Sequence, residues 1–305
     1  MIQYCLRHIL VFNTILHDEI NYMLHIITDT GSMLTQEEAK ELNLELLPLT
    51  VSLDDGEHLR EGVDISPEDF LAEVLKGKRP KTSQVNPGTF LDKYNEIYKD
   101  GDQILVIAMF SKLSGTYNSA VIAREMFKNP EAIFVFDALS IAGPQVYEVR
   151  TAIKMRDAGK SIEEILEQIS YQSKNQYSAL LPRDIRFLVN GGRLDKRLFP
   201  IARLANVHPI CVLDDNGVTK DSIKLSLKAS IQRMIKICND HVPRNKAYYH
   251  ILHVDAYEDA LGLADTVCEK LGLTKDKIEI RDASCLAITH AGPKALVLQV
   301  SERFV

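Results

Sequence analysis

The chain has 305 residues, enough for two domains of ordinary size. Its composition, 46% hydrophobic and 26% charged, is that of a folded globular protein. A net charge of -6, with no basic stripe or arm, argues against binding to the phosphates of a nucleic acid.

Cysteine usage and apolar runs set the expected compartment. The five cysteines include no C-x-x-C pair, and no histidine stands at metal-binding spacing. An odd number of free thiols fits a reducing cytoplasm, so we expect a cytoplasmic protein without a metal or cofactor. No apolar run approaches the roughly 20 residues that span a bilayer, so we expect no transmembrane segment.

The first strand pattern begins directly after Met23, over residues 25–28. Residues 1–22 form an isolated amphipathic piece without turn residues, an n-region or a cleavage site. We therefore interpret 1–22 as an N-terminal extension rather than a signal peptide.

Strand and helix patterns alternate through the first half of the chain. Thr35 and Glu38 form a capping-box motif, and Ser66 precedes Pro67 at another helix start. The segment around Pro80 is expected to be a loop. Strands are expected over residues 25–28, 46–53, 103–110 and 132–136, and helices over 35–42, 66–76, 88–98, 119–127 and 142–158. This order predicts a doubly wound, mostly parallel sheet in an N-terminal α/β domain of residues 23–160.

The second half predicts a different sheet, in an α/β domain of residues 161–305. The segment Asp214-Asp-Asn-Gly217 is a hairpin signal with Asn-Gly at its centre, which indicates antiparallel neighbours in a mixed sheet. Strands are expected over residues 177–181, 209–213, 217–222, 248–254, 277–281 and 295–300, and helices over 161–173, 183–189, 226–239 and 256–270. A ligand is expected between or within the two domains.

One segment favours a ligand site on physical grounds. Ser114-Gly115-Thr116 follows the apolar strand 103–110 and opens a helix. Hydroxyls and free backbone N–H groups at this end of a parallel strand favour anions. Considered one at a time, these residues also have structural interpretations. Ser114 can be a helix cap, Asp29 a turn cap and His290 a structural histidine.

Taken in order, five motifs resemble the DegV family of bacterial proteins, from Met23 to the C-terminus. The Ser-Gly-Thr-Tyr and Gly-Gly-Arg motifs are specific as a pair. The motifs are Thr28-Asp29, Pro80-Lys-Thr-Ser-Gln84, Leu113-Ser-Gly-Thr-Tyr-Asn-Ser-Ala120, Leu188 to Leu194 with its Gly-Gly-Arg, and His290-Ala-Gly-Pro293.

The resemblance implies a non-catalytic protein of two α/β domains that binds a long-chain fatty acid such as palmitate or stearate. Some members present the carboxylate to the catalytic subunit of a fatty acid kinase, which is therefore an expected partner. The carboxylate would be held by side chains and by N–H groups near the helix start. The resemblance assigns the side chains of Thr82, Ser83, Ser114 and His290 and the backbone of Gly115 and Thr116, with Asp29 and Arg193 in support.

The physical chemistry agrees with this assignment. Burial of an alkyl chain contributes about 0.8 kcal/mol per methylene, so apolar contact would supply affinity and the hydroxyl cluster would supply orientation. Hydroxyl donors, a helix N-terminus and a protonated His290 could together satisfy a carboxylate without a full salt bridge.

Several positions depart from the family pattern. The family commonly has an Arg-rich stretch where this chain has Lys224-Leu-Ser226-Leu-Lys228. Met33, Val85 and Ala138 also stand where the family usually has other residues. We expect Ser226 to weaken the coupling to a kinase.

Two other functions are consistent with parts of the sequence. Ser114 as nucleophile with His290 as base would make an acyl hydrolase, but no Gly-x-Ser-x-Gly turn surrounds Ser114. A binder of nucleotides or sugar phosphates is suggested only by the α/β pattern, because the chain lacks a phosphate-binding G-x-x-x-x-G-K loop.

Overall fold

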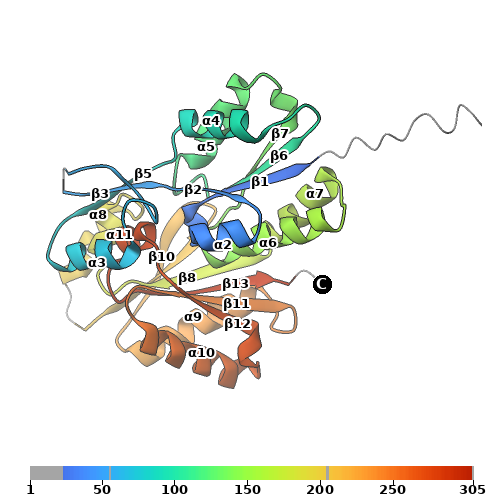
Figure 1. Ribbon diagram of the computed structural model, residues 1–305. Coiled ribbons are helices and arrows are strands. Elements are labelled where there is room, and N and C mark those ends of the chain that lie inside the picture. The colour runs from blue at the N-terminus through green and yellow to red at the C-terminus, as the bar shows by residue number, and fades with distance from the viewer. Residues whose placement is uncertain (1–22, 55, 204–205, 304–305) are drawn as a thin grey trace, which may run out of the picture.

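The computed structural model describes residues 23–54, 56–203 and 206–303, and the predicted extension of residues 1–22 lies outside them. Two α/β layers stack on one another, with a small three-stranded sheet at one side (Figure 1). The division of the chain at residue 160 remains a prediction.

The upper layer in Figure 1 contains a parallel four-stranded sheet in the order β2-β1-β6-β7. Its strands are β1 (Leu24–Asp29), β2 (Glu45–Leu47), β6 (Gln103–Ala108) and β7 (Ile133–Asp137). Helices α4 (Pro87–Ile97) and α5 (Thr116–Met126) pack on one face, and α2 (Gln36–Glu41), α6 (Gly143–Asp157) and α7 (Ile162–Lys174) on the other. Strand β6 is a continuous apolar run because helices cover both its faces. The predicted doubly wound sheet is confirmed.

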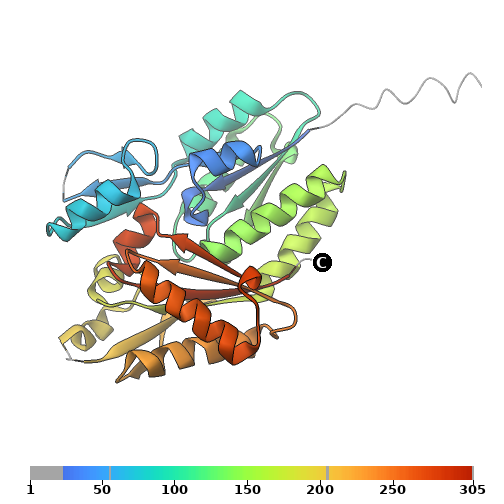
Figure 2. The ribbon, with the colours of Figure 1, turned by 60° about the horizontal axis from the view of Figure 1, so that its bottom comes forward.

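The lower layer contains the predicted mixed sheet, of six strands in the order β10-β9-β8-β13-β11-β12. Only β11 and β12 pair in parallel. Helices α9 (Leu227–His241) and α10 (Tyr257–Leu271) cover the face away from α6 (Figures 1 and 2). The strands are β8 (Gln176–Leu181), β9 (His208–Asp214), β10 (Gly217–Lys224), β11 (Ala247–His253), β12 (Ile278–Asp282) and β13 (Leu296–Glu302).

Helix α6 lies between the two large sheets. It contacts β1 and β6 above and β11 and β13 below. Most of its residues are buried, from Gly143 to Met155, so it has no broad polar face. A helix that is covered on all sides has this pattern, and α6 therefore joins the two layers into one body.

Two sequence predictions about strands are wrong. The single strand predicted over residues 46–53 is two strands, β2 and β3 (Thr50–Leu53), in different sheets. Pro48 lies between them and has no backbone N–H to donate to a neighbouring strand, so the ladder is interrupted before the central strand β3. The segment predicted as a loop around Pro80 is strand β5 (Pro80–Ser83), antiparallel to β3. As an edge strand of the sheet β4-β3-β5, with β4 at Leu59–Arg60, it tolerates a proline.

Smaller differences concern helices and turns. The segment before the last strand holds an unpredicted helix, α11 (Cys285–Ala291), and the β9–β10 hairpin turns at Asp215–Asn216, with Gly217 starting β10 at φ 94°. The predicted caps at Thr35 and Ser66 are confirmed. The remaining helices are α3 (Pro67–Leu75), α8 (Arg186–Asn190), η1 (Thr30–Ser32), η2 (Pro130–Ala132), η3 (Lys196–Arg203) and η4 (Lys275–Lys277).

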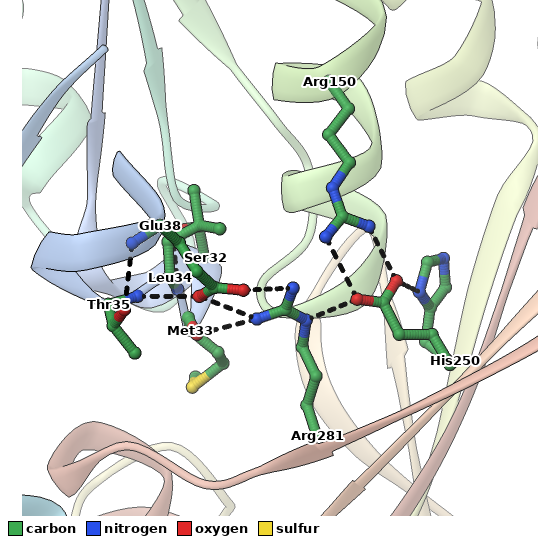
Figure 3. A network of polar contacts seen from close by, with 9 residues as sticks. Ser32, Met33, Leu34, Thr35, Glu38, Arg150, His250 and Arg281 are labelled. Carbon is green, nitrogen blue, oxygen red and sulfur yellow. Dashed lines mark hydrogen bonds and ion pairs between the residues drawn. The ribbon is translucent and has the colours of Figure 1, made fainter. Parts of the chain in front are cut away.

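An ion-pair network links the two layers at the β12 edge (Figure 3). Arg150 of α6 donates to both carboxylate oxygens of Glu279, at 2.8 and 3.2 Å. Arg281 donates to Glu279 at 2.8 Å and, with two nitrogens, to Glu38 of α2 at 2.8 and 3.1 Å. Burial would raise the pKa of Glu279, but its cationic and histidine neighbours hold the pKa well below the ordinary value. The network fixes the position of α2 and α6 over the lower sheet.

Candidate functional site

An apolar cavity lies between the lower sheet, helix α11 and the carboxyl end of β6. The cavity has a volume of about 740 Å³, counted together with the open space at its mouth. The lining is aliphatic apart from four polar side chains. These are Ser178, Arg193, His290 and Gln299. Such an interior suits a hydrocarbon chain better than a sugar or a nucleotide.

Thr82 contacts His290, which lines the cavity, although 208 residues separate the two in sequence. The Thr82 hydroxyl and His290 Nε2 form a 2.9 Å hydrogen bond between β5 and α11. Strand β5 turns the Thr82 side chain toward α11, whereas Ser83 is exposed, as the alternation of a strand requires. The structure therefore brings Thr82 and His290 together and places Ser83 outside this pair.

Gly191 allows the His290 ring to sit against the end of α8. A Cβ atom at Gly191 would lie 2.4 Å from His290 Nδ1, closer than real Cβ contacts. Nδ1 is buried and has no hydrogen-bond partner among the described residues. The imidazole ring is thus held on one side by the Thr82 hydroxyl and on the other by the backbone of Gly191.

Burial, and after it the positive charge of Arg193, lower the pKa of His290 from 6.5 to about 3. The imidazole is therefore neutral at pH 7. The protonated His290 of the sequence analysis was expected beside a bound carboxylate, and for that bound state it stays a prediction.

Arg193 is a partly buried cation at the cavity. Its Nε donates to Leu113 O at 3.0 Å and its Nη1 to Gly191 O at 2.6 Å, which ties the segment before α5 to the end of α8. No carboxylate of the described residues lies within ion-pair distance of its guanidinium. Burial lowers the pKa of Arg193 somewhat. A buried cation without a counterion is costly, which favours an anionic ligand.

The segment that opens α5 contributes hydroxyls next to Leu113. Ser114 Oγ lies 2.9 Å from Thr116 Oγ1 and accepts the Thr116 N–H at 3.2 Å. The N-cap itself is Gly115. A Cβ there would lie 2.0 Å from Gln84 Oε1, so glycine is what lets Gln84 cross over and donate to Ser119 Oγ at 2.8 Å. Ser114 is thus bonded to Thr116, and His290 to Thr82.

Asp29 lies at the end of β1, where its carboxylate organises backbone. Its two oxygens accept the N–H groups of Gly31 and Met109, both at 2.8 Å. Burial raises the pKa of Asp29 to about 6. Through Met109, which lines the cavity, Asp29 fixes a wall of the cavity.

Glu61 is a supporting residue that the sequence analysis did not identify. It is 2% exposed and accepts the Thr30 hydroxyl at 2.6 Å and the N–H of Leu286, in the first turn of α11, at 2.9 Å. Burial raises the pKa of this carboxyl group. Glu61 thus anchors the helix that carries His290. Its only signal in the sequence was an acidic residue in a turn, which is common on protein surfaces.

Other site types find no support in the described residues. Residues 23–54, 56–203 and 206–303 contain no group of three or more metal-ligating side chains. None of the helices described is both long enough and apolar enough to cross a membrane.

Comparisons with known proteins agree with this architecture. Residues 23–303 match the model of a family described as "Uncharacterised protein, DegV family". A DegV domain-containing protein of Clostridium perfringens is 33% identical over 256 residues, which cover 80% of this chain and 86% of the relative. Another, from Clostridium acetobutylicum, is 30% identical and covers 92% of this chain and 99% of the relative.

Solved structures share the fold at lower identity. A fatty acid binding DegV family protein of Streptococcus agalactiae superposes with a TM-score of 0.83 at 22% identity, over 93% of this chain and 100% of that one. A stearic acid-binding protein of Eubacterium ventriosum gives a TM-score of 0.81 at 20% identity, over 92% and 98%. The match of the family model over nearly the whole chain, together with these relatives and this fold, shows that the chain belongs to the DegV family.

Proposed function

We propose that this protein binds a long-chain fatty acid without catalysing its conversion. The acyl chain occupies the cavity, and the carboxylate lies at its mouth beside Thr82, His290 and Arg193. The observation that carries the proposal is an apolar cavity with an unpaired cation and a neutral imidazole at one end. The bound stearic acid named for the protein of Eubacterium ventriosum supports the ligand class.

The polar groups at the mouth suit a carboxylate. The hydrogen bond between Thr82 and His290 leaves one donor of the pair free for a carboxylate. This donor is Nδ1–H when the Thr82 hydroxyl donates to Nε2, and the Thr82 hydroxyl when Nε2–H donates to it. The same positive charge of Arg193 that lowers the pKa of His290 attracts an anion. Ser114, Gly115 and Thr116 place two hydroxyls and a helix start on the neighbouring segment, where we propose a further contact with the carboxylate.

The geometry favours this function over an acyl hydrolase. A serine nucleophile needs its hydroxyl bonded to the base, and the base needs an orienting acid. Here Ser114 is bonded to Thr116, and no described acid bonds to His290 Nδ1. An intact fatty acid in the purified protein is therefore expected, and an acyl adduct on Ser114 would favour the hydrolase.

The test compares two adjacent hydroxyls. Thr82→Val keeps the shape of the side chain but removes the hydroxyl that faces His290, and Ser83→Ala removes an exposed one. Loss of a hydrogen bond to a charged group costs about 1.5–3 kcal/mol, so we expect Thr82→Val to weaken fatty acid binding by about 10- to 150-fold. Ser83→Ala should bind like the wild type. Absence of binding in the wild type, measured by calorimetry and by mass spectrometry of co-purified lipid, would refute the proposal.

We further propose that a separate kinase subunit phosphorylates the bound carboxylate. Thr82 and His290 are neutral donors and leave a carboxylate oxygen able to attack a phosphoryl group, which supports this role. Ser226 caps α9 by accepting the Ala229 N–H at 3.2 Å, where the family commonly has an arginine. Acyl phosphate formation by the protein with a bacterial fatty acid kinase subunit tests the partnership.

A further inference from the structure

The cavity has a second polar end, formed by Gln299 of β13. The side chain is 1% exposed and lines the cavity together with Ser178. Its Oε1 accepts the Gly143 N–H at 3.1 Å, and its Nε2 donates to Ile141 O at 3.0 Å and to Ser178 Oγ at 2.9 Å. Both amide hydrogens are used, so the carboxamide is fixed in place.

Strand register places Gln299 at the end of the cavity away from His290. Val297 pairs with Leu180 and Gln299 with Ser178, and all four line the cavity. His290 precedes β13, and the Gln299 pair lies two residues, or about 7 Å of strand rise, beyond the Val297 pair along β13. The next pair of positions on this face, at 176 and 301, does not line the cavity.

The layer between α6 and the sheet becomes polar behind this pair. Ser301 is buried, and Gln176 donates to Ala138 O at 2.7 Å. Gln176 lies beside Glu148, whose fully buried carboxyl group has a pKa raised well above the ordinary value by burial. If the methyl end of a fatty acid separated these buried polar groups, their hydrogen bonds would be lost and nothing would replace them. The hydrocarbon environment therefore ends where Gln299 lies.

The turn that Gln299 holds is also rigid. Ala142 has a φ of 57°, an unfavourable conformation for a residue with a side chain, and lies between the two backbone groups that bond to Gln299. Its N–H donates to Gly31 O at 2.7 Å. The wall beside Gln299 is thus fixed from both layers and does not yield easily to a longer ligand.

We propose that Gln299, braced by Ser178, is the end-stop of the acyl cavity and sets the longest acyl chain that the protein buries completely. This inference rests on the proposed function. Each methylene buried before the end-stop tightens binding by up to about fourfold, the equivalent of 0.8 kcal/mol. Beyond the stopping length this gain disappears, and affinity levels off or falls.

The experiment measures dissociation constants for straight-chain saturated fatty acids of increasing length. Gln299→Ala removes the carboxamide and opens space at the end of the cavity, so the length at which affinity stops rising should increase by about two to four carbons. Gln176→Ala is the matched control, because it removes a bonded glutamine from the same face outside the cavity. Its length profile should equal that of the wild type.

A second measurement uses the wild-type protein and does not depend on the variant folding. A fatty acid with a photoreactive group at its methyl end should label Gln299, Ser178 or Ile141. An unchanged stopping length in folded Gln299→Ala, or labelling confined to residues beside His290, would overturn the end-stop while leaving fatty acid binding intact. Failure of the wild type to bind any chain length would instead refute the proposed function.

Discussion

Adding one methyl group at Gly191 should disable the carboxylate end of the cavity while leaving the fold in place. Gly191 has φ -69° and ψ -8°, a helical conformation that alanine adopts readily. The new Cβ would lie 2.4 Å from His290 Nδ1 and 3.0 Å from Cε1, so the imidazole must move away. Movement of the ring breaks its 2.9 Å hydrogen bond with Thr82.

The expected magnitudes follow from these contacts. Overpacking costs about 1–3 kcal/mol of stability. The reduced conformational freedom of the unfolded chain offsets about 0.4–1 kcal/mol of this cost, so the net loss of stability is between about 0 and 2.6 kcal/mol. In the bound state, a hydrogen bond from the imidazole to a carboxylate is lost, worth about 1.5–3 kcal/mol or 10- to 150-fold in affinity. Displacement of a fluorescent fatty acid measures the affinity, and urea unfolding measures the stability.

The adjacent glycine supplies the control. Gly192 has φ 72°, and a Cβ there meets no atom within 4 Å. Gly192→Ala should therefore lose stability from backbone strain, by about 1–2 kcal/mol, yet bind fatty acid like the wild type. Wild-type affinity in folded Gly191→Ala, or equal losses of affinity in both variants, would show that the position of the His290 ring does not govern binding.

Three further predictions concern stability, pH and the partner. Glu61→Ala leaves the Thr30 hydroxyl and the Leu286 N–H without an acceptor and should lower the free energy of unfolding by about 2–4 kcal/mol. Glu61→Gln should lower it by less. If urea unfolding ranks the two variants in the opposite order, Glu61 does not have this role. The pKa of His290 is lower in the folded than in the unfolded chain, so its contribution to stability should fall below pH 6.5 by up to about 1.4 kcal/mol per pH unit. In His290→Gln the free energy of unfolding should therefore decrease less between pH 7 and pH 5 than in the wild type. Ser226→Arg should increase acyl phosphate formation with a kinase subunit without changing fatty acid affinity, and an unchanged rate would count against a role for this position.

The layers of the fold could be predicted because local signals agree with the tertiary structure. Capping at Thr35 and the apolar run of β6 specify their elements directly. Strand β5 was missed because a proline and two hydroxyl residues read as a loop, and only its pairing with β3 makes it a strand. Helix α11 was missed because its first turn is anchored by Glu61, from a distant part of the chain.

The site was predictable only as a set of residues. The motifs named Thr82 and His290, and the structure brings them into contact. The protonation state of His290 could not be predicted, because it depends on burial and on the position of Arg193. Gln299 lies in a β-strand pattern that gives no reason to distinguish it, and its importance follows from strand register and the position of α6.

The two polar ends of the cavity differ in unused hydrogen-bonding capacity, and this difference would set the orientation of a bound fatty acid. At the inner end, both amide hydrogens of Gln299 are already donated, to Ile141 O and Ser178 Oγ. At the mouth, His290 Nδ1 has no partner among the described residues, and the guanidinium of Arg193 has no carboxylate there. A carboxylate placed beside Gln299 would be desolvated without compensation, whereas at the mouth it gains donors and a counterion. We therefore expect a bound fatty acid to enter methyl end first, and polarity alone would not have distinguished the two ends.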